Sequence, residues 1–487
     1  MSVGVNLTFL GISARTYGVA EFGKLIFVLA TTSFLELIFS GSADSILIRE
    51  QVRNPNDREE NLRACASLHS VFSLMVVLAS IGIALYFRRD SNVSWGLVLA
   101  GIGSACQILF CIPLAHFRSE QNMFFESVLI TGERLLFLCG LLTVVALKAQ
   151  MVFVFACLMT SMATKTTIAY AWLFRRIAVR ASTPAAAKLR YFWIESLPLM
   201  GVTLMLSLHW RLDLFLMKAL STAEQLGIYA ASFRAMEVLR IVPVDVITSA
   251  FPIFCAAAAS QAGTNQLGRA YSGLVRLALC TALLVTAVGF LFAPIATRFL
   301  FGGAFASAVV PLRVLIVSFP LIFWNQINSI TLTATDRQRW MLFSLVGALA
   351  CQLLVDLVLI PRRGAAGAGL GFVLGEVALL LGTLFAITPL AIDIKRCLGV
   401  FGKLVAAALV LWLLVGQLYR SSVWLAVVVV LPAYLLLLLL LNVMTRAEIS
   451  MFTATLGTFV RSRTGAGRAA AIQPRVIAVL PDVSGEN

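Results

Sequence analysis

Two apolar stretches in the middle of the chain carry charged side chains where a membrane would cover them. The stretch from Ser207 to Pro252 carries His209, Arg211, Asp213, Arg234, Glu237, Arg240 and Asp245. A charged side chain at mid-bilayer costs roughly 3 kcal/mol on lenient insertion scales, so such residues usually face protein or water. Guanidinium groups placed there are suited to bind carboxylates or phosphates through paired N–H donors. The stretch therefore predicts the lining of a translocation cavity.

The spacing on the predicted helix 227–256 aligns these charges. At about 100° per residue, Arg234, Glu237 and Asp245 fall on one face, and Arg240 lies on its flank. One polar stripe thus follows most of this helix. An arginine and a glutamate at i, i+3 also favour a local pair that neutralises itself, and this alternative stays open.

The predicted helix 197–218 separates its charges onto two faces. His209 and Asp213 are four residues apart and share a face, whereas Arg211 projects almost opposite. Arg211 therefore needs a partner on another helix, or an anion. His209 is either a hydrogen-bonding residue or a proton switch. We expect Asp213 near the outer end of its helix, where interfacial water lowers the cost of its charge.

Two acidic residues share a face of the predicted helix 22–48. Glu36 lies near the middle of the span, and Asp44 lies eight residues further on. Burial favours the protonated form of a carboxyl group, so Glu36 could take up and release protons. It is equally well explained as a fixed partner of Arg211 or Arg240. For the more isolated charges Glu133, Arg134, Lys165, Arg313, Asp356 and Glu376, we expect solvated helix ends or snorkelling.

The composition requires a membrane to hold these elements. Hydrophobic residues make up 60% of the 487 residues and charged residues 13%, with a mean hydropathy of +0.94. A soluble globule is nearer one half apolar, and the long apolar runs lack the alternation of barrel strands. We predict an all-α, polytopic membrane protein. Nine scattered cysteines without CxxC spacing indicate buried free thiols.

Apolar runs of about 20 residues predict fourteen membrane helices. They lie near 3–16, 22–48, 63–87, 95–116, 127–147, 151–174, 197–218, 227–256, 272–293, 309–333, 340–360, 366–390, 400–419 and 423–443. We expect an N-terminal lobe (1–174), a cytoplasmic linker (175–196), a second lobe (197–393), two extra helices (394–443) and a mostly disordered tail (444–487).

The basic residues predict the orientation. Assigning alternate loops to opposite sides gives about 20 lysines and arginines on one side and about 10 on the other. The richer side contains the 175–196 linker and the C-terminus and is therefore predicted to be cytoplasmic. This topology explains the net charge of +15 better than a nucleic-acid partner does. The arginine-bearing tail is expected to touch anionic lipid headgroups.

Signatures of enzymes are missing from the sequence. Its three histidines, His69, His116 and His209, lie on separate predicted helices, and there is no HExxH, GxxxxGK[ST] or GxSxG motif. We therefore predict no enzyme activity, no metal, no cofactor and no ATP-driven transport by this chain alone.

A weak internal repeat connects the two predicted lobes. RTYGVAEFG at 15–23 precedes the second predicted helix much as STAEQLGIY at 221–229 precedes the eighth. Internal repeats are how many transporters build a site at the bilayer midplane.

Several segments together resemble a known family. They are the run at 211–234, AFPIF at 250–254, the YG and FG pairs at 17–23, and LIPRRGAAGA at 359–368. The chain resembles polysaccharide-export flippases of the multidrug/oligosaccharidyl-lipid/polysaccharide superfamily. The resemblance implies two helical lobes around a central cavity lined by helices 1, 2, 7 and 8. It also implies, as substrate, an oligosaccharide on a polyprenyl diphosphate, flipped to the outer leaflet of the bacterial inner membrane.

On this interpretation the residues take two roles. Arg211, Arg234, Arg240, His209 and Arg15 would bind the substrate. Glu36, Asp44, Asp213, Glu237 and Asp245 would balance charge or couple to ions. Membrane lipids, a polysaccharide polymerase and export machinery are the expected partners.

Other functions stay open at this point. A cation-coupled multidrug exporter of the same superfamily should present acidic charge to its drugs, which the arginines argue against. A polysaccharide polymerase or ligase should have a long outer loop, and the predicted outer loops span only about 5 to 15 residues. A lipid-binding scaffold without transport is a further alternative.

Overall fold

The fold is described from a computed structural model. It describes residues 2–40, 46–48, 50–51, 57–120, 123–176, 186–259, 263–390, 392–421, 429–430, 432–434 and 436–438. Within these ranges some side chains are left out, among them those of residues 241–249. Most of the predicted helix 423–443 and the whole predicted tail lie outside the described residues.

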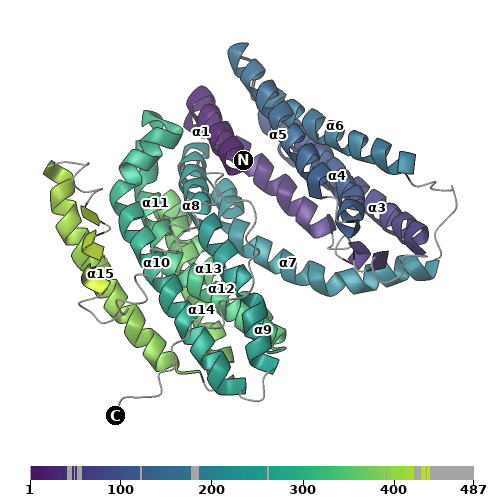
Figure 1. The fold of residues 1–487 in the computed structure, drawn as a ribbon. Helices are drawn as coiled ribbons and strands as arrows, with labels where there is room; N and C mark the ends of the chain where they lie inside the picture. The colour runs from purple at the N-terminus through teal and green to yellow at the C-terminus, as the bar shows by residue number, and fades with distance from the viewer. Residues whose placement is uncertain are drawn as a thin grey trace. The chain divides into compact units, whose positions relative to one another are not determined.

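Helices make up nearly all of the described chain, which contains no strand. The first half holds α1 (Ser2–Ser40), α3 (Arg58–Tyr86), α4 (Ser91–Ser119), α5 (Met123–Ala146) and α6 (Val152–Arg176). The second half holds α7 (Ala186–Leu220), α8 (Ala223–Ser249), α9 (Phe251–Ala259), α10 (Gly263–Phe301), η2 (Gly303–Ala308), α11 (Val309–Val317), α12 (Phe319–Ala334), α13 (Gln338–Arg363), α14 (Ala365–Ile387) and η3 (Thr388–Leu390), followed by α15 (Ile394–Ser421). Figure 1 shows their arrangement.

The prediction of an all-α protein with many membrane spans is confirmed. Nine segments of the described residues are long and apolar enough to cross a membrane. Helices α7 and α8, which carry the charges of the predicted site, are not among these nine. Charged side chains within helices of membrane length need protein or water neighbours to shield them.

The first two predicted helices form α1, which turns sharply at one glycine. Gly18 has φ 76° and ψ 179°, so helical geometry breaks there although helix flanks it on both sides. A side chain at this position would be strained, because positive φ is readily adopted only by glycine. Helix α1 is described to Ser40, residues 41–45 lie outside the described residues, and residues 46–48 within the predicted span are helical.

Helix α7 begins inside the segment predicted as a polar linker. Residues 186–196 are helical and continuous with the predicted span 197–218. Phe192 explains this extension, because its fully buried ring packs in a cluster with Leu62 and Cys65 of α3. Beside it, the ammonium group of Lys188 lies 3.0 Å from Asp57 and 2.9 Å from Glu60. Residues 186–196, predicted as part of a polar linker, are therefore helical because they pack against α3.

The length of α7 lets one helix contact both halves of the chain. It contacts α3 and α1 of the first half, and α13, α14 and α8 of the second. Figure 1 shows α7 running as one long helix from beside α3 toward α13 and α14. The lobe boundaries themselves stay predictions. By compactness the chain divides into residues 1–399, which contain the site, and residues 400–487.

The two repeat segments meet in space. Gly23 of α1 lies against Gly227 of α8, and a Cβ atom on Gly23 would come within 2.6 Å of the Gly227 nitrogen. A Cβ atom on Gly227 would come within 2.0 Å of the Val19 carbonyl oxygen. Neither position has room for a side chain, so both glycines are required by the close approach of α1 and α8.

Candidate functional site

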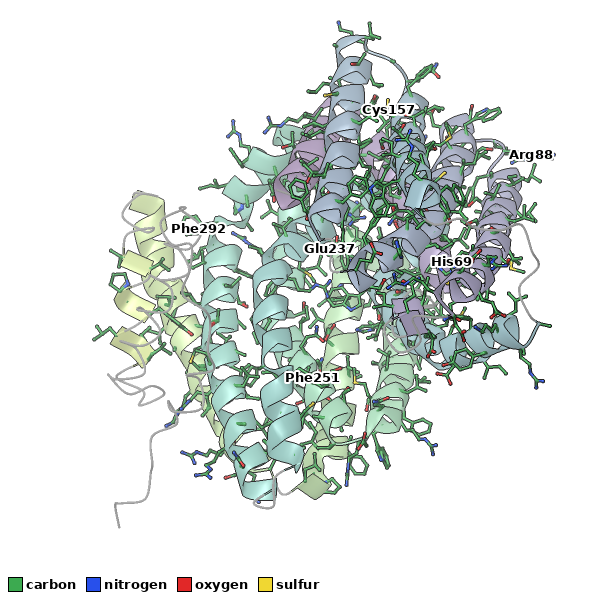
Figure 2. The ribbon with its side chains drawn as sticks, turned by 45° about the vertical axis from the view of Figure 1, so that its right-hand side comes forward. His69, Arg88, Cys157, Glu237, Phe251 and Phe292 are labelled. Atoms are coloured by element: carbon green, nitrogen blue, oxygen red, sulfur yellow. The ribbon has the colours of Figure 1, made fainter. Side chains whose placement is uncertain are left out.

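The first guanidinium of the predicted site is paired within its own helix. Arg234 Nη1 lies 2.6 Å from Glu237 Oε2, with the two side chains 21% and 26% exposed. Glu237 is labelled in Figure 2 on α8, the helix that contacts α1. The alternative of a self-neutralising pair at i, i+3 is therefore what the structure contains. Arg234 brings little net charge to the site.

Arg240 has an aromatic partner instead of an acidic one. Its Cζ atom lies 3.9 Å from the ring centroid of Trp210 on α7, and its side chain is half-buried. Two carboxylates, Glu237 and Glu376, lie within electrostatic range. Both are engaged elsewhere: Glu237 by Arg234 and Glu376 by His209. Among the described residues, no carboxylate lies within 4.0 Å of this guanidinium.

Arg211 is likewise half-buried without a close acidic partner in the described chain. It interacts at longer range with Arg234, Glu237 and Glu36. The opposite charges that act on Arg211 are Glu237 of α8 and Glu36 of α1. A buried guanidinium without a paired carboxylate is costly, and an anionic ligand would lower that cost.

The opposite face of α7 enters a buried polar cluster. His209 Nε2 lies 3.2 Å from Glu376 Oε1 on α14, and these side chains are 1% and 2% exposed. Asn325 of α12 donates to Glu376 Oε2 at 2.7 Å. His209 also stacks on Phe372, with ring centroids 5.8 Å apart. His209 is thus buried against α12 and α14, and the substrate-binding role predicted for it stays a prediction.

Asp213 belongs to the same buried cluster. Tyr229 and Gln352 both donate hydrogen bonds to its carboxylate, and it is 1% exposed. The expectation of an interfacially solvated Asp213 is therefore wrong, since packing against α8 and α13 excludes water from it. The carboxyl group of Asp356 on α13 faces that of Asp213.

Asp213 and Asp356 form an acidic pair in which some carboxylate oxygens have no hydrogen-bond donor among the described residues. Neither oxygen of Asp356 has a donor within reach in the described chain, and the residue is completely buried. Gly371 of α14 makes the space, because a Cβ atom there would lie 1.8 Å from Asp356 Oδ1. Two buried carboxyl groups in contact cannot both be ionised cheaply, so the pair requires a proton or a cation. The expectation of solvated helix ends for Asp356 and Glu376 is wrong.

A second charged cluster lies in the first half. Lys165 Nζ is 2.9 Å from Glu133 Oε2 and 2.6 Å from Gln107 Oε1, and only 3% of its side chain is exposed. Glu36 lies within electrostatic range of Ser104, Lys165 and Arg211. The expectation of snorkelling is wrong for Lys165 because its ammonium is held inside by two acceptors.

Other predicted site residues lie apart from this region or outside the described chain. Arg15 is exposed and donates to the Phe299 carbonyl near the C-terminal end of α10, a position that suits a cation. Asp44 lies outside the described residues. Asp245 lies within α8, but its side chain is not described. The roles of all three stay predictions.

Sequence reasoning missed Trp210, Tyr229, Asn325 and Gln352. A signal existed for Gln352: it lies four residues before Asp356, while Gly371 and Gly375 are spaced equally on the next helix. Both glycines leave room for the polar pair. The aromatic residues gave no comparable pattern, because apolar helices contain many of them.

No metal centre is formed by the part of the chain that the structure describes. It contains no group of three or more histidine, cysteine, aspartate or glutamate side chains placed to hold a metal ion. The remaining histidines are structural in their contacts: His69 Nδ1 lies 2.8 Å from the Cys65 carbonyl oxygen, and His116 lies 3.5 Å from Glu120.

Solved structures with this fold are membrane transporters. The structure of the lipid II flippase MurJ in its inward closed conformation superposes with a TM-score of 0.67 at 13% identity, covering 90% of this chain and 96% of that one. An inward-facing multidrug resistance MATE family transporter of the MOP superfamily gives 0.67 at 17% identity, covering 80% and 94%. A MOP superfamily transporter from Pyrococcus furiosus gives 0.57 at 16%, covering 80% and 93%. The chain has the fold of these transporters.

The sequence itself assigns the family. The model of the family described as polysaccharide biosynthesis protein matches residues 2–258, more than half of the chain, and the chain belongs to this family. No curated protein matches the sequence. The resemblance noted from the sequence motifs is thereby confirmed.

Proposed function

We propose that this protein is a flippase that moves polyprenyl-diphosphate-linked oligosaccharides from the cytoplasmic to the outer leaflet of the bacterial inner membrane by alternating access. The observation that carries the proposal is the pair of half-buried arginines, Arg211 and Arg240, on α7 and α8. Neither has a carboxylate within 4.0 Å among the described residues. Two uncompensated guanidinium groups match the charge and donor geometry of a diphosphate.

The family supports the sugar part of the proposal, and the fold supports movement across the membrane. Polysaccharide biosynthesis needs lipid-linked intermediates to change leaflets, and MurJ is a flippase of lipid II by name. A polysaccharide polymerase and export machinery would then receive the product on the outer side.

The buried acidic pair supports ion coupling in this proposal. Asp213 and Asp356 face each other in the second half, where a proton or monovalent cation would relieve their mutual repulsion. The Glu133–Lys165 pair of the first half carries its own cation and needs no ion from outside.

Removing the two uncompensated arginines tests the proposal. Purified protein in proteoliposomes would be given a fluorescent polyprenyl-diphosphate oligosaccharide in one leaflet, and its arrival in the other leaflet would be measured. We expect the double variant Arg211→Gln/Arg240→Gln to slow translocation at least about tenfold, because each charge-assisted hydrogen bond contributes roughly 1.5–3 kcal/mol.

The matched control is Arg234→Gln/Glu237→Gln, which removes one arginine of the same helix together with its own counter-charge. It should keep most of the activity at equal amounts of inserted protein. Translocation by the arginine double variant at the wild-type rate would refute the proposal. Transport of a cationic dye in place of the diphosphate would favour the multidrug exporter.

A further inference from the structure

We propose that Trp210 is a positioning residue, which holds the Arg240 guanidinium in the membrane interior and leaves its N–H donors available to a diphosphate. The inference rests on the proposed function and deepens it. Its starting point is the 3.9 Å separation between Arg240 Cζ and the Trp210 ring centroid, short enough for a cation–π contact.

The type of partner decides what an arginine can still bind. A carboxylate would take two of the five N–H donors and cancel the positive charge, as Glu237 does for Arg234. An indole ring stabilises the charge through its π face and takes no donor from the guanidinium edge. Arg240 therefore keeps both its charge and its donors.

The indole is itself fixed by packing. Phe372 of α14 lies 5.3 Å from the Trp210 ring, with the planes at 63°, and Phe233 of α8 lies 6.2 Å away at 65°. These edge-on contacts leave a ring face for the guanidinium. Trp210 directly precedes Arg211, so one turn of α7 carries one proposed diphosphate ligand and the ring that contacts the other.

The surrounding carboxylates do not compete for this arginine. Glu376 is held by His209 at 3.2 Å and by Asn325 at 2.7 Å, and Glu237 is held by Arg234 at 2.6 Å. The described carboxylates near Arg240 are thus engaged by other residues, and Arg240 contacts an aromatic partner instead.

A double-mutant cycle with full-length protein in nanodiscs tests this assignment. Farnesyl diphosphate serves as the diphosphate probe and farnesol as the probe without phosphate, both measured by isothermal titration. We expect Trp210→Leu to weaken farnesyl diphosphate binding about tenfold and Trp210→Phe less, with farnesol binding unchanged. In an Arg240→Gln background, Trp210→Leu should have no further effect, because its action passes through Arg240.

Controls separate positioning from stability. Trp340→Leu removes a 46% exposed tryptophan elsewhere and should bind as wild type does. The Trp210→Phe variant keeps an aromatic face if Trp210→Leu fails to fold. Wild-type affinity for farnesyl diphosphate in folded Trp210→Leu or Trp210→Phe would refute the role of Trp210. An equally large loss of affinity on Trp210→Leu in the Arg240→Gln background would refute it too. Neither result would contradict the proposed function. Equal binding of farnesyl diphosphate and farnesol to the wild type would overturn the proposed function and this inference with it.

Discussion

The chemistry of single residues in this protein depends on which charges are already compensated. Arg234 and Arg240 lie on the same helix, yet one is neutralised by Glu237 at 2.6 Å and the other is stacked on Trp210. Asp213 receives hydrogen bonds from Tyr229 and Gln352, whereas Asp356 has no donor in the described chain. Residues of the same type therefore differ in whether their charge is already compensated by a neighbour.

At this scale the acidic pair yields a prediction. Asp356→Asn replaces one carboxyl group with an amide of the same shape that can donate to Asp213. We expect the unfolding temperature in detergent to stay unchanged or rise, because the repulsion between two carboxyl groups is removed. The acceleration of transport by an imposed proton or sodium gradient should disappear, as measured in the proteoliposome assay.

The contrasting variant is Asp213→Leu, which leaves the buried donors Tyr229 and Gln352 without their acceptor. We expect it to lower stability by about 2–4 kcal/mol. A gradient response that survives in the Asp356→Asn variant would exclude this pair as the coupling site.

At the scale of elements, the approach of α1 and α8 is set by two glycines. The Cβ atom that Gly227→Ala introduces would lie 2.0 Å from the Val19 carbonyl oxygen, which is backbone and cannot rotate away. The two helices must then separate. These helices carry the repeat segments, so the same glycines hold corresponding parts of the two halves together.

We expect Gly227→Ala to destabilise the protein by about 1–3 kcal/mol, the usual cost of overpacking, and to reduce transport. Thermal unfolding in detergent measures the first effect. Gly273→Ala in α10 is the control: nothing lies within 4 Å of its Cβ position, so stability should be unchanged or improved. Equal stability of the two alanine variants would show that α1 and α8 are not in this contact in the membrane.

At the scale of the whole molecule, the distribution of basic residues predicts which loops lie on the cytoplasmic side of the membrane. The excess of lysine and arginine falls on the side of the 175–196 segment and the C-terminus. Alkaline phosphatase is active only outside the cytoplasm, so fusions to it report the side directly. We expect a fusion after Arg89, between α3 and α4, to be active and a fusion at the C-terminus to be inactive. The reverse result would invert the topology and the direction of transport.

The sequence by itself determined the class of protein and the course of the chain. Apolar run length predicted almost all of the helices, because a bilayer demands about 20 apolar residues per span whatever they pack against. The sequence also drew attention to α7 and α8, since charged residues within apolar runs are rare and usually functional. The prediction from local patterns was wrong at 186–196, where a helix continues through polar residues. The reason is tertiary, because Phe192 packs on α3 and Lys188 pairs with acidic residues on and beside it.

Only the tertiary structure decided which charges are partnered. Sequence spacing places Asp213, Asp356 and Glu376 on three separate helices, and nothing local reveals that α7, α13 and α14 bring them together. The same holds for Trp210 and Arg240, thirty positions apart on different helices. Electrostatic and aromatic contacts act over a few ångströms in space, whereas sequence patterns report on one helix at a time. The availability of a charge for a ligand is therefore a property of the packed helices.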